Sequence, residues 1–453
     1  MRTLVKNILR RDAPAASIRA AGWVRTRRDN KAFSFIELND GSCLQNLQVI
    51  ADVGIPGSAD LGKMNTGASI EVEGELVASP AQGQKWELRA ASIRLLGGVP
   101  EDYPLQKKGH TPEFLRTIPH LRARTNLFGA VFRTRSRMAY AIHRFFQERD
   151  FAYVHTPIIT ASDCEGAGEM FRVTTLAPER AAMDAEDFFG RRAFLTVSGQ
   201  LEGETFACAL SNIYTFGPTF RAENSNTSRH AAEFWMIEPE MAFCDLVGDM
   251  DLAEAMIQFL CREMLDQHDG DLDVFARFID KGLRERLEFV ASRPFERVCY
   301  TDAVKLLQAS GKAFEFPVAY GHHLQSEHER WLTEEHFKCP VTVFDYPKEI
   351  KPFYMHLNDD DKTVGAMDVL VPGIGEIIGG SQREARLDVL IENFTRHGID
   401  PAAYQWYADL RKYGTVPHAG FGLGFERLLM FVTGVHNIRD VIPFARTPGH
   451  CGF

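Results

Sequence analysis

The segment from Phe220 to Phe234 gathers the side chains best suited to chemistry in this sequence. It places two arginines, a histidine and two acids around a polar turn and closes on an aromatic ring. Arg221 keeps its charge at physiological pH, and a guanidinium can hold a phosphate through two parallel hydrogen bonds. Glu223 can accept a hydrogen bond from the amino edge of a base, and Phe234 can stack on a purine. A charged hairpin loop with satisfied ion pairs explains the same residues, so this segment alone leaves both interpretations open.

A second segment, Gly420 to Arg427, alternates glycine with apolar residues. On a strand every second side chain faces the same side, so Gly420, Gly422 and Gly424 leave one face bare for a flat ring or a phosphate. Arg427 follows in the first turn of an apolar helix, where its charge adds to the positive helix end and favours an anion. Close packing of helix on strand accounts for the glycines but not for the arginine.

A pair of acids could hold a metal ion beside such an anion. Glu376 lies in the glycine-rich segment from Gly375 to Arg383, and Asp368 lies on the preceding predicted strand. Carboxylates on adjacent strands can hold Mg²⁺ against phosphates. Single acids near turns are mostly solvated, which makes Asp368 the weaker of the two candidates.

The segment from Thr196 to Glu204 is small, polar and acidic and follows a predicted strand. Its composition suits recognition of a small polar ligand, and a helix N-cap at Ser198 explains it equally well. No Ser/His/Asp array, Walker loop or Rossmann glycine pattern stands out elsewhere. These four segments carry the chemistry that the residues suggest by themselves.

Length and composition describe a soluble globular protein with more than one domain. The chain has 453 residues, of which 45% are hydrophobic and 25% are charged, and this length predicts two or three domains. No apolar run is long enough to span a bilayer. The eight cysteines form no Cys-x-x-Cys pair, so we expect neither a zinc site nor a disulfide framework, and we expect a reducing cytoplasm.

Charge is unevenly distributed along the chain. The formal net charge is -10, yet residues 1–50 hold nine Lys or Arg against four Asp or Glu. A local basic face on an acidic protein can meet a nucleic-acid backbone. The first residues fit a transit peptide or a short basic amphipathic helix, and the helix is preferred because a strand pattern follows at once.

The N-terminal part of the chain has the pattern of short strands, with a turn signal of the Asp-Gly kind after the second. Apart from a stretch around 60–64, no strong helix pattern interrupts them, which predicts a small Greek-key barrel such as an OB-fold. Polar sequence with glycine and proline from 97 to 119 predicts a hinge. The predicted strands cover residues 18–26, 32–38, 44–51, 69–77 and 85–93.

The remainder of the chain mixes helices and strands. An apolar stripe predicts a helix from Leu127 to about Asp150, followed by a strand from Phe151 to Ile159 that Pro157 interrupts. Hairpin pairs among the other strands predict an antiparallel sheet with helical insertions. Further helices are predicted over 246–265, 327–336 and 384–396. The other strand candidates cover 195–198, 213–220, 233–243, 341–345, 353–357, 366–371, 376–379 and 419–423.

In this order, the motif segments resemble those of the class II aminoacyl-tRNA synthetases. Pro157 after the long helix is similar to the family's first motif, a dimer element, while 220–233 is similar to the second and 420–427 to the third. The N-terminal barrel is typical of the aspartate, asparagine and lysine subgroup. Within this subgroup, three segments resemble the asparaginyl-tRNA synthetases of bacterial type: residues 197–201 with Glu204, residues 214–227 and residues 375–383. The resemblance covers essentially the whole chain.

This resemblance implies a fold, a reaction and partners. The expected fold class is α+β, with an OB-fold anticodon-binding barrel over 1–100, a hinge over 101–124, and a catalytic domain over 125–453. The catalytic domain is expected to hold an antiparallel β-sheet flanked by helices, with a helical insertion at about 246–335. The expected protein is a cytoplasmic homodimer with no membrane segment. It would convert ATP and asparagine into asparaginyl-adenylate and pyrophosphate, with Mg²⁺ accompanying ATP and no zinc. It would then pass the asparaginyl group to the 3′ end of tRNA(Asn).

The resemblance also implies roles for single residues, grouped by ligand. The expected catalytic residues are Arg221, at the α-phosphate and the substrate carboxylate, and Arg427, which with His230 reaches the γ end of ATP. The other ATP contacts are Glu223 at the adenine amino group, Phe234 stacked on adenine, Gly424 and, through Mg²⁺, Glu376 with Asp368. The asparagine contacts are Glu165 at the α-ammonium group, Gln200, Glu204 and Arg383. The anticodon contacts are Phe35, Gln48 and Glu87.

Phe35 has two interpretations. By resemblance it stacks on an anticodon base, while Gln48 and Glu87 read base edges. Small barrels also fill their interiors with aromatic residues, so burial in the barrel core is the alternative. Stacking is the preferred interpretation.

The choice of amino acid depends on the surroundings of Gly203. Aspartyl relatives have a lysine at this place, and its absence removes a cation that favours a carboxylate substrate. Glu204 adds a negative charge close by, which can accept a hydrogen bond from an amide and repel a carboxylate, while Arg383 donates to the side-chain oxygen. We therefore expect asparagine over aspartate. An aspartyl-tRNA synthetase of relaxed specificity and a catalytically silent nucleotide- or RNA-binding relative remain the alternatives.

Overall fold

The computed structural model describes residues 1–162, 170–180, 183–266 and 270–452. The chain divides into two compact units, Met1–Thr134 with Gln267–Phe278, and Arg135–Asp266 with Ile279–Phe453. Helix α4 (Asn126–Gln147) supplies its first residues to one unit and the rest to the other. Each unit contains a hydrophobic core of its own.

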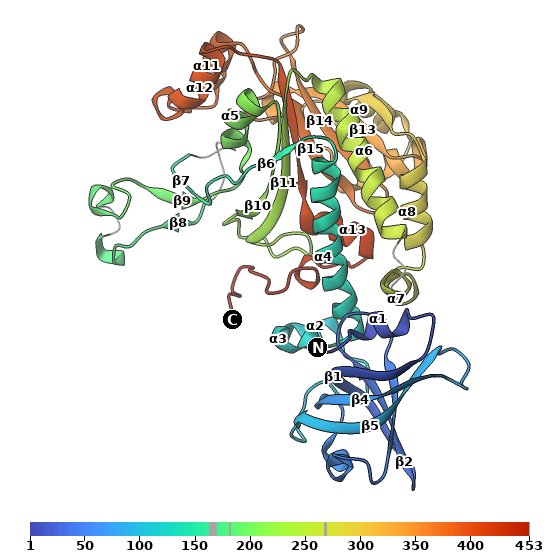
Figure 1. Ribbon diagram of the computed structural model, residues 1–453. Helices are drawn as coiled ribbons and strands as arrows, with labels where there is room; N and C mark the ends of the chain where they lie inside the picture. The colour runs from blue at the N-terminus through green and yellow to red at the C-terminus, as the bar shows by residue number, and fades with distance from the viewer. Residues whose placement is uncertain (163–169, 181–182, 267–269, 453) are drawn as a thin grey trace. The chain divides into compact units, whose positions relative to one another are not determined.

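A closed β-barrel makes up most of the first unit, drawn in blue in Figure 1. Its strands are hydrogen-bonded in the order β1, β2, β3, β5, β4, with β3 and β5 parallel and the other pairs antiparallel. This confirms the predicted OB-fold barrel. The strands are β1 (Ala15–Asp29), β2 (Phe33–Asn39), β3 (Leu47–Asp52), β4 (Ser69–Ala78) and β5 (Trp86–Gly97), with the helical turn η1 (Ser58–Lys63) between β3 and β4.

Short helices complete the first unit. The basic N-terminal stretch forms the helix α1 (Val5–Leu9), and β1 begins soon after it, as the sequence predicts. Arg133 of α4 holds Asp271 through two hydrogen bonds of 2.9 and 2.6 Å, which ties α7 to this unit. The other helices here are α2 (Pro112–Thr117), α3 (Pro119–Arg122) and α7 (Asp271–Phe278).

An eight-stranded sheet is the centre of the second unit (Figure 1), in the order β12, β13, β14, β15, β16, β11, β10, β6. The prediction of an antiparallel sheet is confirmed for the central pairs and is wrong at both edges, because β12 pairs parallel with β13 and β6 pairs parallel with β10. The pairs between them are antiparallel. The strands are β6 (Ala152–Tyr153), β10 (Asn212–Phe220), β11 (Glu233–Ala242), β12 (Glu296–Cys299), β13 (Val341–Pro347), β14 (Thr363–Val371), β15 (Gly375–Gln382) and β16 (His418–Gly424).

Helices flank this sheet, as the expected fold class requires. The predicted helix over 327–336 is α10 (Ser326–Arg330) continued by a π-helix, η4 (Trp331–His336). The stretch over 353–357 is not a strand; it makes two isolated bridges, Met355 to Arg383 and Leu357 to Val364. The other helices are α5 (Gln200–Leu210), α6 (Leu246–Leu265), α8 (Leu283–Ser292), α9 (Tyr300–Ala309), α11 (Leu387–Arg396), α12 (Gln405–Lys412) and α13 (Phe425–Thr433).

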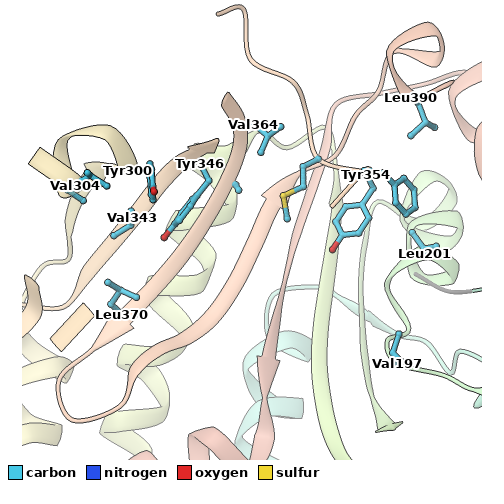
Figure 2. Close-up of a cluster of buried hydrophobic side chains, with 14 of the residues drawn as sticks. Val197, Leu201, Tyr300, Val304, Val343, Tyr346, Tyr354, Val364, Leu370 and Leu390 are labelled. Carbon is cyan, nitrogen blue, oxygen red and sulfur yellow. The ribbon is translucent and has the colours of Figure 1, made fainter. Parts of the chain in front are cut away.

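The apolar core of the second unit holds the eight-stranded sheet to these helices. Figure 2 shows part of it, where Tyr300 and Val304 of α9 meet Val343 and Tyr346 of β13. Tyr354 and Leu201 extend the same cluster toward α5. Burial of this apolar surface fixes the strands that carry the candidate site. A small separate sheet, in the order β7, β9, β8, is formed by β7 (Ile159–Thr160), β8 (Arg172–Val173) and β9 (Ala193–Leu195).

Two further expectations concern the whole chain. No helix among the described residues has the length and apolar character needed to cross a bilayer. The cysteines within the described ranges are all free thiols. Cys164 lies outside those ranges.

Candidate active site

A cavity of about 250 Å³ opens on one face of the eight-stranded sheet. Residues from the loop between β10 and β11, from β15, and from the junction of β16 with α13 line it together. The structure thus brings together side chains that are up to about two hundred positions apart in sequence. Seven predicted nucleotide contacts lie on its wall: Arg221, Glu223, His230, Phe234, Glu376, Gly424 and Arg427.

Two arginines from different elements of the fold line this cavity. Arg221 follows β10, and its guanidinium lies 5.5 Å from the ring centre of Phe234 on the paired strand β11. Arg427 occupies the first turn of α13, at the positive end of that helix, as predicted. Its Nη1 donates to the backbone oxygen of Glu376 at 3.2 Å and lies 3.8 Å from one carboxylate oxygen of the same residue. The cations therefore surround a space large enough for phosphate groups.

The glycines of β16 serve different purposes. A β-carbon at Gly420 would lie 2.4 Å from the carboxylate carbon of Glu240, and one at Gly422 would lie 2.8 Å from the methyl of Met236. The space beside both glycines is thus already filled by side chains of β11. Gly424 has no neighbour closer than 3.7 Å and opens on the cavity. The prediction of one continuous bare face is wrong, because Glu240 and Met236 occupy most of it.

The acids Asp368 and Glu376 face each other across Gly379. A β-carbon on Gly379 would lie 3.3 Å from Oε1 of Glu376 and 3.5 Å from Oδ1 of Asp368, so both carboxylates converge on one spot of the sheet. Hard oxygen donors of this kind suit Mg²⁺, and the arrangement fits the predicted pair of ligands. Asp368 does not line the cavity. Both of its oxygens are held by Nζ of Lys351, each at 3.0 Å.

A third acid, Glu329, lies behind this pair. Its Oε2 accepts a hydrogen bond from the backbone N–H of Glu376 at 3.0 Å. Burial, followed by the nearby charge of Glu376, raises the pKa of Glu329 to about 8. Within the described part of the chain, no group of three or more His, Cys, Asp or Glu side chains is arranged to hold a metal ion.

One face of β11 leads from the cavity into a buried polar cluster. Phe234, Met236, Glu238 and Glu240 alternate along this strand and therefore share a face. Phe234 and Met236 line the cavity, whereas Glu238 and Glu240 are buried beyond it. The nucleotide contacts and the residues predicted for the amino acid are thus joined by a single strand.

Glu204 is the centre of this buried cluster. Its side chain is 0% exposed and accepts hydrogen bonds from four residues. These donors are Gln200 Nε2 at 3.1 Å, Tyr407 Oη at 2.8 Å, Arg411 Nη2 at 2.8 Å and His418 Nε2 at 2.9 Å. Burial raises the pKa of Glu204, but Arg411, His418 and Arg383 outweigh it and hold the pKa well below its usual value. Glu204 is therefore an ionised carboxylate whose lone pairs are largely used inside the protein.

Arg383 is clamped beside Glu204 by Glu240. Its Nε donates to one carboxylate oxygen of Glu240 at 3.1 Å and its Nη2 to the other, while its Nη1 donates to Ser381 at 2.9 Å. The Nε lies 4.0 Å from Glu204. Burial raises the pKa of Glu240, Arg383 opposes that rise, and Glu204 adds to it. The guanidinium of Arg383 is thus held at a fixed place by Glu240 and Ser381.

Asp249 of α6 lies near Arg383 and Glu240 and is unusual because its buried carboxyl has no hydrogen-bond partner among the described residues. It is wholly buried, and neither of its carboxylate oxygens accepts a hydrogen bond from a described residue. Burial raises the pKa of Asp249 well above its usual value, with Arg383 opposing and Glu240 adding. Such surroundings favour the neutral form of the carboxyl.

The start of α5 positions the other predicted amino-acid contacts. The helix begins at Gln200 with Gly199 as its N-cap residue, so Ser198 is not the cap. Ser198 instead donates to Glu238, which also accepts from the backbone N–H of Gly199 at 3.0 Å and from Thr215 at 3.0 Å. Glu165, predicted to hold the α-ammonium group, lies outside the described residues.

Gly203 faces the cluster from the next turn of α5. A β-carbon there would lie 3.4 Å from Ile213 and 3.8 Å from Cγ of Glu240. These are ordinary van der Waals distances, so a longer side chain can start at this position. A lysine at 203 would carry its charge toward Glu240.

The predicted anticodon residues lie on the outer face of the barrel. Phe35 is half-buried between the core residues Ser34 and Ile36, so its ring belongs to the outer face and not to the barrel core. Gln48 pairs directly with Glu87 of β5. Glu87 is buried and accepts hydrogen bonds from Ser79 and Gln84.

Sequence reasoning missed several residues of the site. Glu238 and Glu240 carry a signal that could have found them, because two acids two positions apart on an apolar strand share one face. Tyr407, Arg411 and His418 carry no such signal, since their partner Glu204 lies more than two hundred positions away in the sequence. Lys351 follows a short turn and shows no pattern of its own.

Comparisons with known proteins place this geometry in a family. A family model described as tRNA synthetases class II (D, K and N) matches residues 111–448, and one described as an OB-fold nucleic acid binding domain matches residues 18–96. The asparagine--tRNA ligase of Nitratidesulfovibrio vulgaris is 62% identical over 459 residues, covering 100% of this chain and 100% of its own. That of Microcystis aeruginosa is 60% identical over 449 residues, covering 99% of each.

A solved structure agrees. The crystal structure of asparaginyl-tRNA synthetase from Pyrococcus horikoshii complexed with asparaginyl-adenylate is similar with a TM-score of 0.88 and 30% sequence identity, covering 100% of this chain and 99% of that one. The resemblance drawn from the motifs is thereby confirmed. The chain belongs to the class II tRNA synthetases of the aspartate, lysine and asparagine group, and within that group to the asparagine--tRNA ligases.

Proposed function

We propose that this ligase joins asparagine to tRNA(Asn) in two steps on the site described above. The observation that carries the proposal is the shared face of β11, which connects the cation-lined cavity with the buried cluster around Arg383. ATP occupies the cavity and asparagine lies toward the cluster. Their reacting groups, the α-phosphate and the carboxylate, meet near Arg221.

In the first step the asparagine carboxylate attacks the α-phosphorus of ATP and pyrophosphate leaves. No protein base is needed, because the nucleophile is already ionised, so the site acts by positioning and by neutralising charge. Arg221 holds the α-phosphate and the attacking carboxylate. Arg427 and His230 hold the γ end, Phe234 stacks on adenine, and Glu223 accepts from the adenine amino group, with Gly424 leaving room for the nucleotide.

Magnesium belongs to this proposal as a companion of ATP. Glu376, with Asp368 beside it, would hold the ion against the phosphates. When bound, Mg²⁺ neutralises charge on the β- and γ-phosphates. The convergence of both carboxylates over Gly379 supports these ligands.

Selection of asparagine is assigned to the buried cluster. Arg383 donates to the side-chain oxygen of asparagine, and the negative charge of Glu204 disfavours aspartate. Because the lone pairs of Glu204 are largely taken, its influence comes mainly through charge, while Gln200 is the nearer polar contact. Glu165 is kept as the proposed partner of the α-ammonium group.

In the second step the asparaginyl group passes to the 3′ end of tRNA(Asn), whose anticodon is read by the barrel. Phe35 stacks on an anticodon base, and Gln48 and Glu87 contact base edges. Replacing Phe35→Ala is expected to weaken tRNA(Asn) binding by about 1–3 kcal/mol, the usual value of one stacked base. Filter binding measures the loss, and pyrophosphate exchange without tRNA should stay at the wild-type rate. Unchanged tRNA affinity would remove Phe35 from the interface.

We further propose a cytoplasmic homodimer, with 1–100 as the anticodon-binding domain, 101–124 as the hinge and 125–453 as the catalytic domain. The edge strand β6 supports a second copy, since a short edge strand that carries the exposed Tyr153 is a surface that a partner would cover. Light scattering at micromolar concentration tests this. A monomeric mass would contradict the dimer.

One assay tests the central proposal. The purified protein is offered purified tRNA(Asn) and tRNA(Asp), each with asparagine and with aspartate. Efficient charging is expected only for asparagine on tRNA(Asn). Faster activation of aspartate than of asparagine would contradict the assigned substrate.

A further inference from the structure

Lys351 contacts Asp368 of the acid pair Asp368–Glu376, although neither step of the proposed reaction uses this lysine. Its Nζ lies 3.0 Å from each carboxylate oxygen of Asp368 and 3.9 Å from the ring centre of Tyr346. Its side chain is only 13% exposed. The ammonium group is therefore fixed by a carboxylate on one side and an aromatic face on the other, and it cannot easily turn away into solvent.

The charges around this pair are balanced by the protein itself. Lys351, Arg427 and Arg221 all act on the carboxylate of Glu376 as nearby positive charges. The acids are Asp368 and Glu376. Among the groups that act most strongly on Glu376, these three cations match the acids one for one even when Glu329 is counted as charged. A dication approaching this site without a nucleotide would therefore meet no excess of negative charge.

ATP reverses this balance. Its triphosphate engages Arg221 and Arg427, and what remains for a metal is a set of phosphate and carboxylate oxygens with Lys351 as the remaining cation. The lysine contacts both oxygens of Asp368 on one side, and a carboxylate offers about four lone-pair sites, so lone pairs remain for a metal that arrives with the phosphates.

We propose that Lys351 makes divalent-metal binding at the Asp368–Glu376 pair depend on the nucleotide. The inference rests on the proposed metal ligands. Lys351 acts as a resident counter-cation that keeps the site closed to free Mg²⁺ and lets the ion enter together with ATP. It is a positioning residue in this role, since it touches Asp368 and not the reacting atoms.

Metal uptake measured directly tests the inference. Mn²⁺ serves as the probe, and electron paramagnetic resonance reports the free ion with and without a non-hydrolysable ATP analogue. The wild-type protein is expected to bind Mn²⁺ at this site only with the analogue. Lys351→Met keeps the apolar stem but removes the charge, and it should bind Mn²⁺ without nucleotide at least about tenfold more tightly, because a unit charge at close range acts strongly on a dication.

Three variants separate the explanations. Lys351→Arg keeps a cation and should behave like the wild type, and Lys351→Gln is a second neutral variant in case Lys351→Met folds poorly. Nucleotide-free uptake by the wild type as tight as uptake with the analogue would overturn the inference. So would a neutral variant that matches Lys351→Arg.

Glu376→Gln distinguishes this failure from that of the proposed metal site. If Glu376→Gln loses the uptake that accompanies ATP while the neutral Lys351 variants match the wild type, only the role of Lys351 is wrong. If Glu376→Gln retains wild-type uptake, the proposed metal ligand is wrong and the inference about Lys351 fails with it.

Discussion

The two halves of the active site hold their charges in opposite ways. In the nucleotide cavity, the side chains of Arg427 and Glu376 are 38% and 41% exposed, and they lie 3.8 Å apart. In the cluster beyond it, the side chains of Arg383 and Glu204 are 3% and 0% exposed. Glu204 there also accepts hydrogen bonds from neighbours on three helices or strands.

This difference matches the ligands that each half is proposed to bind. A triphosphate carries its own charge, so the cavity needs cations that are accessible and can move from protein partners to phosphates. Asparagine has a neutral side chain, which must be told apart from a carboxylate of the same shape. That distinction requires charges fixed at defined places, and burial in a hydrogen-bonded network fixes them. Loss of a residue should therefore cost mainly rate in the cavity, and both stability and rate in the cluster.

The largest effect is expected at Glu204. Glu204→Gln keeps the shape but leaves the buried guanidinium of Arg411 without its counter-charge. Breaking a buried ion pair in this way costs about 3–5 kcal/mol of folding free energy. Urea denaturation measures the loss, and asparagine activation should fall with it. Tyr407→Phe, which removes one donor but no charge, is the control and should cost about 1 kcal/mol. Equal stability of both variants would show that the charge of Glu204 does not hold the cluster.

Arg427 should show the opposite behaviour. Arg427→Ala removes the cation proposed to hold the γ end of ATP, and pyrophosphate exchange is expected to fall about 100- to 1,000-fold. The midpoint of thermal unfolding should stay within the error of the wild type, because the half-exposed side chain leaves no buried charge behind. Lys305→Ala, in an exposed ion pair on α9, is the control for both measurements. A large loss of stability in Arg427→Ala would contradict the expectation that residues of the cavity affect mainly the rate.

Gly203 sharpens the comparison at the level of specificity. Gly203→Lys would place a cation beside Glu240 and should lower kcat/KM for asparagine by about tenfold or more, because misplaced charge in a buried site is costly. Activation of aspartate relative to asparagine should rise. Gly203→Met is the matched control, since it adds similar bulk without charge. If both variants changed the ratio of the two substrates equally, space rather than charge would govern the choice at this position.

Asp249 tests the buried cluster through pH and has the smallest expected effect. Its folded-state pKa is raised, so its favourable contribution to stability is fully present below the unfolded pKa of about 3.9 and is lost as pH rises above it. Asp249→Asn imitates the neutral form. It should match the wild type near pH 4 and exceed its unfolding free energy by about 1 kcal/mol or more at pH 7.

The control for this measurement is on the same helix. Asp251 is 67% exposed and paired with Arg297, so Asp251→Asn should show no such gain with rising pH. A difference between Asp249→Asn and the wild type that stayed constant from pH 4 to pH 7 would show that Asp249 does not titrate on unfolding.

The nucleotide half was predictable from sequence to a large extent. Arg221, Phe234 and Arg427 lie in segments with strand–turn–strand and strand–helix patterns. These patterns depend only on residues close together in the chain, so they can be recognised in the sequence. Predictions failed where the outcome depended on neighbours from elsewhere. Gly420 was expected to be bare, yet Glu240 of another strand fills its face. The two parallel strand pairs at the edges of the sheet could likewise not be predicted, because a sequence pattern identifies single strands but not their partners.

By itself, the sequence determined most of the elements, the barrel, the two arginines that line the cavity and the resemblance to a family, because each rests on residues close together in the chain. Only the tertiary structure decided which charges neutralise one another. Glu204 and Arg411 lie 207 positions apart, and Glu204 and His418 lie 214 apart. The ion pair between Lys351 and Asp368 likewise forms only in the folded protein. Burial makes such pairs obligatory, since an unpaired charge in an apolar interior is too costly to keep, but it is the fold that chooses the partners.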